Sequence, residues 1–175
     1  EAAETADRQG RARAIWDQAS DPRGTVVEAY LTGRALRLPE EIAGAALRYH
    51  PQCPWLSGFA PAMIAPFRNV RTGEITGIHR TALTTDARKI GRKMLGIAGG
   101  AAIMLDPDEA VALGLTIGEG IETCLSAWLL GLRPVWALGS VDAIRTFDVL
   151  QQVVQRSFGV VDLMHGGIDQ LVQVV

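Results

Sequence analysis

Two glutamates beside a glycine-flanked turn are the residues of this sequence best suited to chemistry. Glu119 stands between Gly118 and Gly120, and Glu122 follows three residues later. The glycines allow the backbone to approach a phosphate closely, and the helix expected to begin here offers unpaired amide donors and a partial positive charge. Residues three apart share a helix face, so both carboxylates are able to point into one crevice. A structural interpretation stays open, in which the two acids only complement the helix dipole.

Other kinds of site have little support in the sequence. The turn Gly118–Gly120 lacks both the Walker lysine and the spacing of the dinucleotide fingerprint. The two cysteines, Cys53 and Cys124, are far apart in sequence, so neither a disulfide framework nor a structural zinc site is indicated. His50 and His165 likewise have no zinc-ligand spacing to another histidine or cysteine.

A basic stretch upstream of the two glutamates is the best candidate surface for a polyanion. Between residues 68 and 93 the only acids are Glu74 and Asp86, whereas the bases are Arg68, Arg71, Arg80, Arg88, Lys89, Arg92 and Lys93. We expect Lys89, Arg92 and Lys93 to lie in a glycine-containing loop, where they contact phosphates without reading sequence. A solvated hairpin explains the same charges equally well.

Two further residues near this stretch bear on a nucleic-acid partner. His79 and Arg80 are adjacent on a predicted strand, so their side chains face opposite sides and at most one lines any single cleft. Trp55 lies in a proline-rich segment and is the aromatic residue best placed to stack on a base.

Composition limits the class of protein. The chain has 175 residues, 48% of them apolar and 21% charged, which suits one compact domain or two small ones and excludes general disorder. No run of residues is long and apolar enough to cross a bilayer, and the N-terminal residues do not resemble a signal peptide, so we expect a cytoplasmic protein without membrane contact. Residues 1–105 carry 14 Lys and Arg against 10 Asp and Glu, whereas residues 106–175 carry 3 against 9. A basic half attracts phosphates and an acidic half gathers divalent cations.

The N-terminal part, residues 1–105, is predicted to be an α+β region. Apolar spacing predicts amphipathic helices over Asp7–Ala19 and Thr25–Arg34, the second capped by Thr25. Ala62–Phe67 and Ile75–Leu83 are predicted to be the strands of a hairpin, and therefore a small antiparallel sheet.

The C-terminal part, residues 106–175, is predicted to be an α/β unit. The pattern is strand, helix, strand, helix, which favours parallel strands with right-handed crossovers. The predicted elements are a strand at Leu115–Ile117, a helix from Ile121 to about Gly131, a strand at Val135–Leu138, a helix at Val141–Phe147 capped by Ser140, and a third strand within Phe158–Leu163. The carboxyl ends of such strands form the usual binding crevice, and Glu119 falls there.

The same segments resemble a known family. Residues 115–127, LTIGEGIETCLSA, followed by residues 134–140, PVWALGS, look like the opening of a Toprim domain of phage- and plasmid-type DNA primases. Five upstream segments resemble the region that precedes Toprim in this primase/helicase-associated family: Ala12–Trp16, Glu28–Leu31, Leu47–Pro51, Ile78–Thr81 and Arg92–Gly96. The similarity spans roughly residues 10–147.

The resemblance implies a Toprim-like parallel sheet with flanking helices, in which Glu119 serves nucleotidyl transfer as acid or base. It also implies Mg²⁺, held by Glu119 and by an Asp-x-Asp pair after a later strand. Asp162 matches the first acid of that pair and Met164 occupies the position of the second, so we expect residues 106–175 to be a partial or divergent Toprim region. Phosphate and nucleic-acid contacts are then expected at Gly118, Gly120, Arg80, Lys89, Arg92 and Lys93.

Three functions follow as hypotheses. The first is a primase-associated Toprim protein that replicates the DNA of a mobile element by magnesium-dependent primer synthesis, with a single-stranded DNA template, nucleotides and a helicase domain or protein as partners. The second is a non-catalytic nucleic-acid-binding or replisome-interaction module that keeps the Toprim fold; the incomplete Asp-x-Asp pair favours it. The third is a small-molecule phosphate-binding domain, which only the glycine turn supports.

Overall fold

The computed structural model describes residues 2–112, 114–147 and 171–174. The helices are α1 (Ala2–Gln18), α2 (Val26–Gly33), α3 (Ile121–Leu129) and α4 (Val141–Thr146), together with the 3₁₀ turn η1 (Asp108–Ala110). The strands are β1 (Arg48–Trp55), β2 (Gly58–Asn69), β3 (Ile75–Leu83), β4 (Lys89–Gly96), β5 (Ala101–Met104), β6 (Leu115–Gly118), β7 (Val135–Ala137) and β8 (Leu171–Val174). No helix in these ranges is long and apolar enough to span a membrane.

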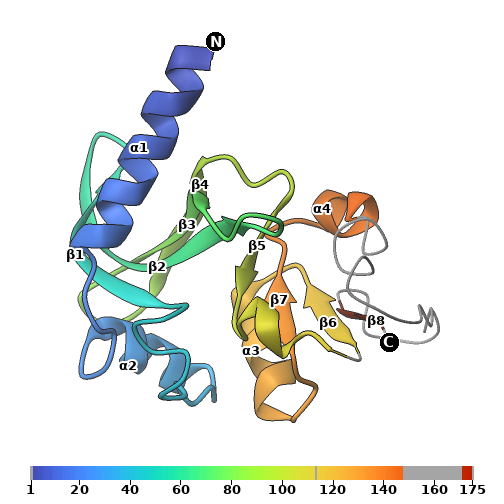
Figure 1. The fold of residues 1–175 in the computed structure, drawn as a ribbon. Helices are drawn as coiled ribbons and strands as arrows, with labels where there is room; N and C mark the ends of the chain where they lie inside the picture. The colour runs from blue at the N-terminus through green and yellow to red at the C-terminus, as the bar shows by residue number, and fades with distance from the viewer. Residues whose placement is uncertain (1, 113, 148–170, 175) are drawn as a thin grey trace.

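One curled, mostly antiparallel sheet runs through the molecule, with helices on its faces (Figure 1). Its strand order is β4-β3-β2-β5-β7-β6-β8, and β1 pairs with β2 beside this path. Among the described strands only β6 and β7 pair in parallel, and α3 connects them. The fold is therefore mixed α/β, as expected, but a fully parallel Toprim-like sheet is not shown.

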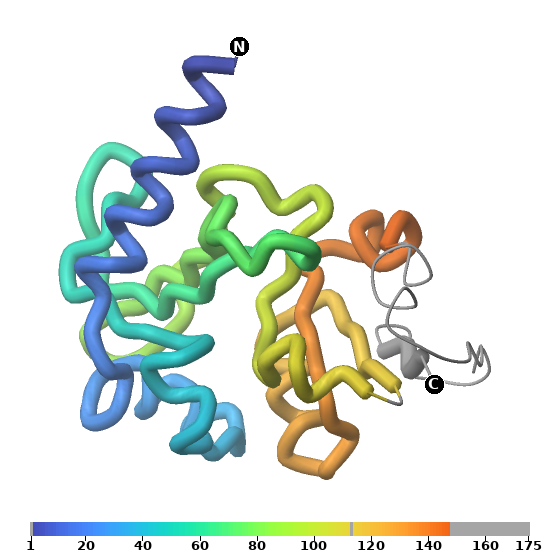
Figure 2. Tube along the Cα trace, in the orientation of Figure 1, coloured from blue at the N-terminus to red at the C-terminus, as the bar shows by residue number. Residues whose placement is uncertain are grey.

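The N-caps predicted for two helices are confirmed. Thr25 caps α2 by accepting a hydrogen bond from the Val27 amide, and Glu28 reaches back to the Gly24 amide at 2.7 Å. Ser140 caps α4 by accepting from the Ala143 amide. The first helix begins at Ala2 rather than Asp7, and its N-terminal end projects from the body of the molecule (Figure 2).

The predicted hairpin is confirmed as β2 and β3, which pair antiparallel. The prediction of a loop around Lys89, Arg92 and Lys93 is wrong, because these residues belong to β4, which pairs with β3 over its whole length. The pairing satisfies the backbone of a segment whose glycines and lysines have low strand propensity. Two glycines, Gly77 of β3 and Gly96 of β4, allow the two strands to approach closely at their paired ends. A Cβ added to Gly96, at φ 90°, would lie 2.4 Å from the Thr76 carbonyl oxygen, and one added to Gly77 would lie 2.7 Å from the Ile97 carbonyl oxygen.

The core lies on both faces of the sheet. On one face α1 buries Ala12, Ile15 and Trp16 against Ile64 and Ile78. On the other face α2 and α3 pack over the sheet in the largest apolar cluster. Strands from both predicted regions, residues 1–105 and 106–175, belong to this one sheet, because β5 pairs with β2 on one side and with β7 on the other.

The strand, helix, strand and helix predicted between Leu115 and Phe147 are confirmed, whereas a Toprim-like parallel sheet is not shown. The parallel unit β6–α3–β7 forms as the sequence indicates, and β8 pairs antiparallel with β6. The third strand predicted within Phe158–Leu163 lies outside the described residues. The division into regions 1–105 and 106–175 stays a prediction.

Candidate functional site

Glu119 lies where the two parallel strands end. The turn that contains it joins β6 to α3, whose N-cap is Gly120. The strand pairing continues past Gly118, because the Leu138 amide donates to the Gly118 carbonyl and the Gly139 amide donates to the Glu119 carbonyl, both at 2.8 Å. The backbone of Glu119 is thereby fixed at the carboxyl edge of the pair, as the sequence predicts.

The Glu119 side chain points toward the edge strand β4. Its Oε1 atom lies 3.0 Å from Nη2 of Arg92, and the side chain is only 15% exposed. The carboxylate therefore does not extend into bulk solvent. It faces a cation from a strand 27 residues away in sequence.

Glu122 is held by two residues from different elements. Its Oε1 atom accepts a 2.6 Å hydrogen bond from the Tyr30 hydroxyl of α2 and lies 3.1 Å from Nζ of Lys89 on β4. Burial alone would raise the pKa of Glu122, but the Tyr30 hydrogen bond and the Lys89 ammonium outweigh it and lower the pKa to about 2. Burial and the same hydrogen bond raise the pKa of Tyr30. Glu122 is therefore ionised and Tyr30 is protonated at neutral pH.

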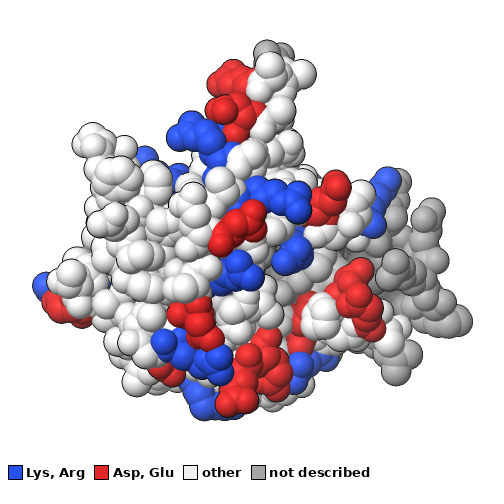
Figure 3. Space-filling model, turned by 60° about the vertical axis from the view of Figure 1, so that its left-hand side comes forward, with Lys and Arg blue, Asp and Glu red and all other residues white. Residues whose placement is uncertain are grey.

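We call Tyr30, Lys89, Arg92, Glu119 and Glu122 the paired-charge site. Three elements meet there: α2, β4 and the turn into α3. The candidate acids and two of the candidate cations thus come together, although no pattern in the sequence indicates that they pair. Basic and acidic side chains also lie next to one another on the face of the molecule in Figure 3, without a broad basic patch in that view.

His79 lies on β3 on the same side as Glu122. It is 5% exposed. Burial lowers the pKa of His79 to about 4; Arg92, Lys89 and Arg80 contribute in the same direction, and Glu122 opposes them. A neutral imidazole therefore borders the paired-charge site above that pH.

Arg80 and Lys93 face the opposite side of the sheet. Nη1 of Arg80 donates to the Pro54 carbonyl at 2.7 Å, and its guanidinium carbon lies 6.0 Å from the Trp55 ring centroid. Nζ of Lys93 lies 5.9 Å from the same centroid. The expectation that His79 and Arg80 diverge is confirmed, and the four cations predicted to contact phosphate are divided between two faces.

The donor chemistry of the paired-charge site suits Mg²⁺ in part. Glu119 and Glu122 supply carboxylate oxygens, which Mg²⁺ prefers, and Glu122 is ionised. Both already pair with cations, so a metal ion would have to displace Arg92 from Glu119. Within the described ranges no three His, Cys, Asp or Glu side chains are grouped to hold a metal ion. Asp162 lies outside the described residues.

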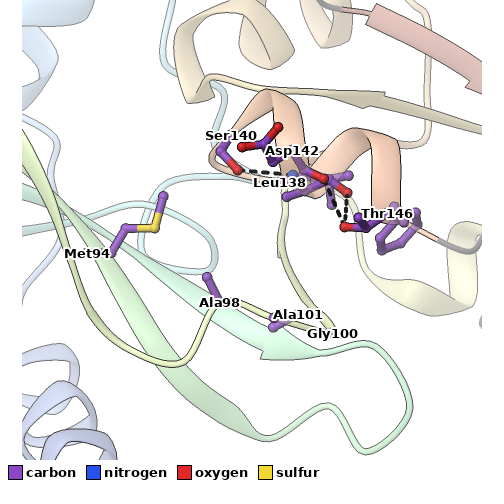
Figure 4. Close-up of a pocket in the computed structure, with 11 residues that line it drawn as sticks. Met94, Ala98, Gly100, Ala101, Leu138, Ser140, Asp142 and Thr146 are labelled. Atoms are coloured by element: carbon purple, nitrogen blue, oxygen red, sulfur yellow. Dashed lines mark hydrogen bonds between the residues drawn. The ribbon is translucent and has the colours of Figure 1, made fainter.

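A cavity of about 290 Å³ lies beside the carboxyl end of β7 (Figure 4). Met94 of β4, the loop before β5, and the segment from Leu138 through helix α4 line it. Its lining residues are Met94, Ala98, Gly99, Gly100, Ala101, Leu138, Ser140, Asp142, Ala143, Thr146 and Phe147. Ser140 and Thr146 are already hydrogen-bonded within α4. Glu119 is not among the lining residues, so the cavity and the paired-charge site are neighbours rather than one site.

Two structural features escaped sequence reasoning. Tyr30 lies on the buried face of the helix predicted over Thr25–Arg34, and its hydroxyl binds Glu122; a buried tyrosine is the available signal, since its hydroxyl needs a partner. The second is Asp106, which is 1% exposed. It accepts hydrogen bonds from the Trp128 indole, the Arg133 guanidinium and the Val135 amide, which connects α3 to β7.

Comparison with known proteins gives a single finding. No curated protein and no solved structure matches the chain. A family model described as a domain of unknown function, DUF7146, matches residues 6–105, which include most of α1 together with α2 and β1 to β5, and hence Tyr30, Lys89 and Arg92. The chain therefore belongs to the DUF7146 family.

Proposed function

We propose that the chain is a primase-associated Toprim protein that takes part in replicating the DNA of a mobile element, by magnesium-dependent nucleotidyl transfer during primer synthesis. The substrates are nucleotides and a single-stranded DNA template, with a helicase domain or protein as a further partner. The proposal places the protein in the cytoplasm, where template and nucleotides are found.

The position of Glu119 is the observation that carries this proposal. A carboxylate 15% exposed lies at the carboxyl end of a parallel strand pair, in a turn between two glycines, 3.0 Å from a guanidinium of the preceding region. Ligands of open α/β sheets bind at that end of the strands. The LTIGEGIETCLSA segment that resembles Toprim is the segment that forms this strand, turn and helix.

The cations of the site suit a polyphosphate. Arg92 and Lys89 each hold one carboxylate and are half and one-third exposed, so an incoming phosphate can reach them. A guanidinium that moves from Glu119 to a phosphate binds the substrate and leaves the carboxylate free to act as a base or as a metal ligand. Glu119, with Asp162, would then hold Mg²⁺, which offsets the charge that develops on the transferring phosphoryl group.

Replacement of Glu119 by Gln tests the proposal. The amide keeps the shape of the side chain but removes its charge and basicity, so template-dependent primer synthesis in Mg²⁺ should fall at least about 100-fold. Glu109→Gln is the matched control, because Glu109 is an exposed glutamate in η1. Equal activity of the Glu119→Gln variant and the unaltered protein would remove Glu119 from the chemistry.

The second candidate is a non-catalytic nucleic-acid-binding module with the same fold. It is favoured because Glu119 and Glu122 already have cationic partners, which neutralise them without a metal ion. This candidate expects oligonucleotide binding without primer synthesis, and a binding affinity that does not depend on Mg²⁺. In that case the ion pairs of the paired-charge site serve only to hold β4 against α3 and the turn before it.

A further inference from the structure

We propose that Trp55, Arg80 and Lys93 form a second surface, which binds single-stranded nucleic acid on the face of the sheet opposite the paired-charge site. We call it the Trp55 surface. It goes beyond the proposed function because, in the part of the chain that the structure describes, none of its side chains hydrogen-bonds or pairs with Glu119 or Glu122. It can therefore be present in an enzyme or in a binding module.

The two cations of the Trp55 surface carry an uncompensated charge. Arg80 and Lys93 are direct partners in the register of β3 and β4. Like charges directly opposite on one face of a sheet are unfavourable. Neither side chain makes a salt bridge among the residues that the structure describes. A phosphate between them would relieve the repulsion.

Trp55 supplies the flat surface that a base needs. Its ring lies against the backbone of Gly91, where an added Cβ would come within 3.2 Å of the ring, and Arg80 and Lys93 lie about 6 Å from its centroid. The indole Nε1 atom is buried without a hydrogen-bond partner in the described part of the chain. Aromatic rings flanked by cations are typical of surfaces that stack bases and hold the backbone of single strands.

The hairpin tip beside Trp55 is built for contact rather than for packing. Leu56 is 75% exposed and has a φ of 51°, a left-handed backbone conformation that is unfavourable for residues other than glycine. Phe59 is 74% exposed on the other strand of the same tip. Burial accounts for neither side chain, and strained positions such as Leu56 gather at binding sites.

Charge distribution favours nucleic acid over a protein partner. From Ile42 to Gly73, a range that includes β1 and β2, the sequence has no Asp or Glu. The same is true from Ala87 to Leu105, a range that includes β4. The strands β1, β2 and β4 therefore carry only positive formal charge, as a polyanion requires.

The test measures binding of a fluorescein-labelled oligothymidylate of about 12 nucleotides, a length that suits the site sizes of single-strand binders. Lys93→Gln and Arg145→Gln are the compared variants, since each removes one exposed cation, from β4 and from α4 respectively. Lys93→Gln should reduce the slope of log affinity against log salt by about 0.7, the value for one lost phosphate contact, while Arg145→Gln leaves it unchanged. Arg92→Gln removes the neighbouring cation on the other face and tests whether the strand binds at the paired-charge site instead. Lys93 is exposed, so its loss does not endanger folding.

Stacking is tested by fluorescence and by Trp55→Leu. The other three tryptophans, Trp16, Trp128 and Trp136, are 7% exposed or less, so quenching by the oligonucleotide should report Trp55 and should disappear in the variant. Affinity should fall about fivefold or more. Leu130→Ala, an exposed apolar residue after α3, is the control.

Three results would overturn the inference: no saturable binding at about 50 mM salt, unchanged affinity in both Trp55→Leu and Lys93→Gln, or a loss with Arg92→Gln alone. The last would place the strand at the paired-charge site instead. Failure of the proposed function is distinguishable, because it appears as primer synthesis that Glu119→Gln does not affect, whatever the oligonucleotide affinity.

Discussion

The hydrogen bond from Tyr30 to Glu122 leads to a prediction about stability and pH. The pKa of Glu122 falls from its ordinary value of 4.5 to about 2 in the folded protein. A folded-state pKa below the unfolded one stabilises the fold at pH values above 4.5, and this stabilisation is lost as the pH falls toward 2. The difference corresponds to about 3 kcal/mol at neutral pH, of which about 2 kcal/mol is lost by pH 3.

Tyr30→Phe removes the hydroxyl and keeps the ring in the core. Since hydrogen bonds to charged groups contribute about 1.5 to 3 kcal/mol, the variant should be less stable by about 2 kcal/mol at pH 7. The deficit should shrink to about half by pH 3, because Glu122 without the Tyr30 donor takes up a proton at a higher pH than in the unaltered protein, and the protonated carboxyl does not need the donor. Urea unfolding at both pH values measures it. Tyr49→Phe is the control, because the Tyr49 hydroxyl, unlike that of Tyr30, makes no hydrogen bond within the described residues. An equal deficit at pH 7 and pH 3 would show that the lost contact is packing and that the charge of Glu122 has no part in it.

Three other residues give predictions of the same kind. Asp106→Asn should lower the free energy of unfolding by about 3 kcal/mol, because it takes the charge from Arg133 and an acceptor from the Val135 amide; Asp142→Asn, at an exposed carboxylate, should change it little. Gly139→Ala should lower the free energy of unfolding by about 2 kcal/mol or more, because φ at this position is 85° and the new Cβ would lie 2.7 Å from Cε of Met94. Gly99→Ala is the control, since its Cβ would meet open space, and thermal unfolding compares the two variants. The NMR resonances of the His79 ring should titrate near pH 4, and a midpoint near 6.5 would contradict a buried, neutral ring. Because the pKa of His79 is lower in the folded protein than the unfolded value of 6.5, its contribution to stability should be full above pH 6.5 and should decline as the pH falls toward 4.

Local signals in the sequence predict the elements that hold the site. Thr25 and Ser140 are caps because of hydroxyl groups that precede apolar helical spacing, and β6–α3–β7 follows from short apolar runs separated by glycine and proline. These features depend on residues within a few positions of one another, so sequence reasoning reaches them. The place of Glu119 at a strand end is one such feature.

The partners of the site residues depend on contacts that local patterns do not contain. Tyr30 and Glu122 are 92 positions apart, and Arg92 and Glu119 are 27 apart. The strand β4 was missed for a related reason, since its lysines, arginine and glycines are poor strand formers and its pairing comes from β3. An edge strand tolerates such residues because its outer side faces solvent, and charges there discourage pairing with other chains.

The register of β4 determines which cation meets which partner. Successive side chains of a strand alternate between faces, so Arg92 reaches Glu119 while Lys93 reaches Trp55. A slip of one residue would exchange the two faces and would separate both cations from their partners. The close approach of Gly77 and Gly96 opposes such a slip, because any other residue that entered either position would place a Cβ within 2.7 Å of a backbone oxygen. The geometry of the paired-charge site and of the Trp55 surface therefore depends on two glycines that carry no charge and contact neither site.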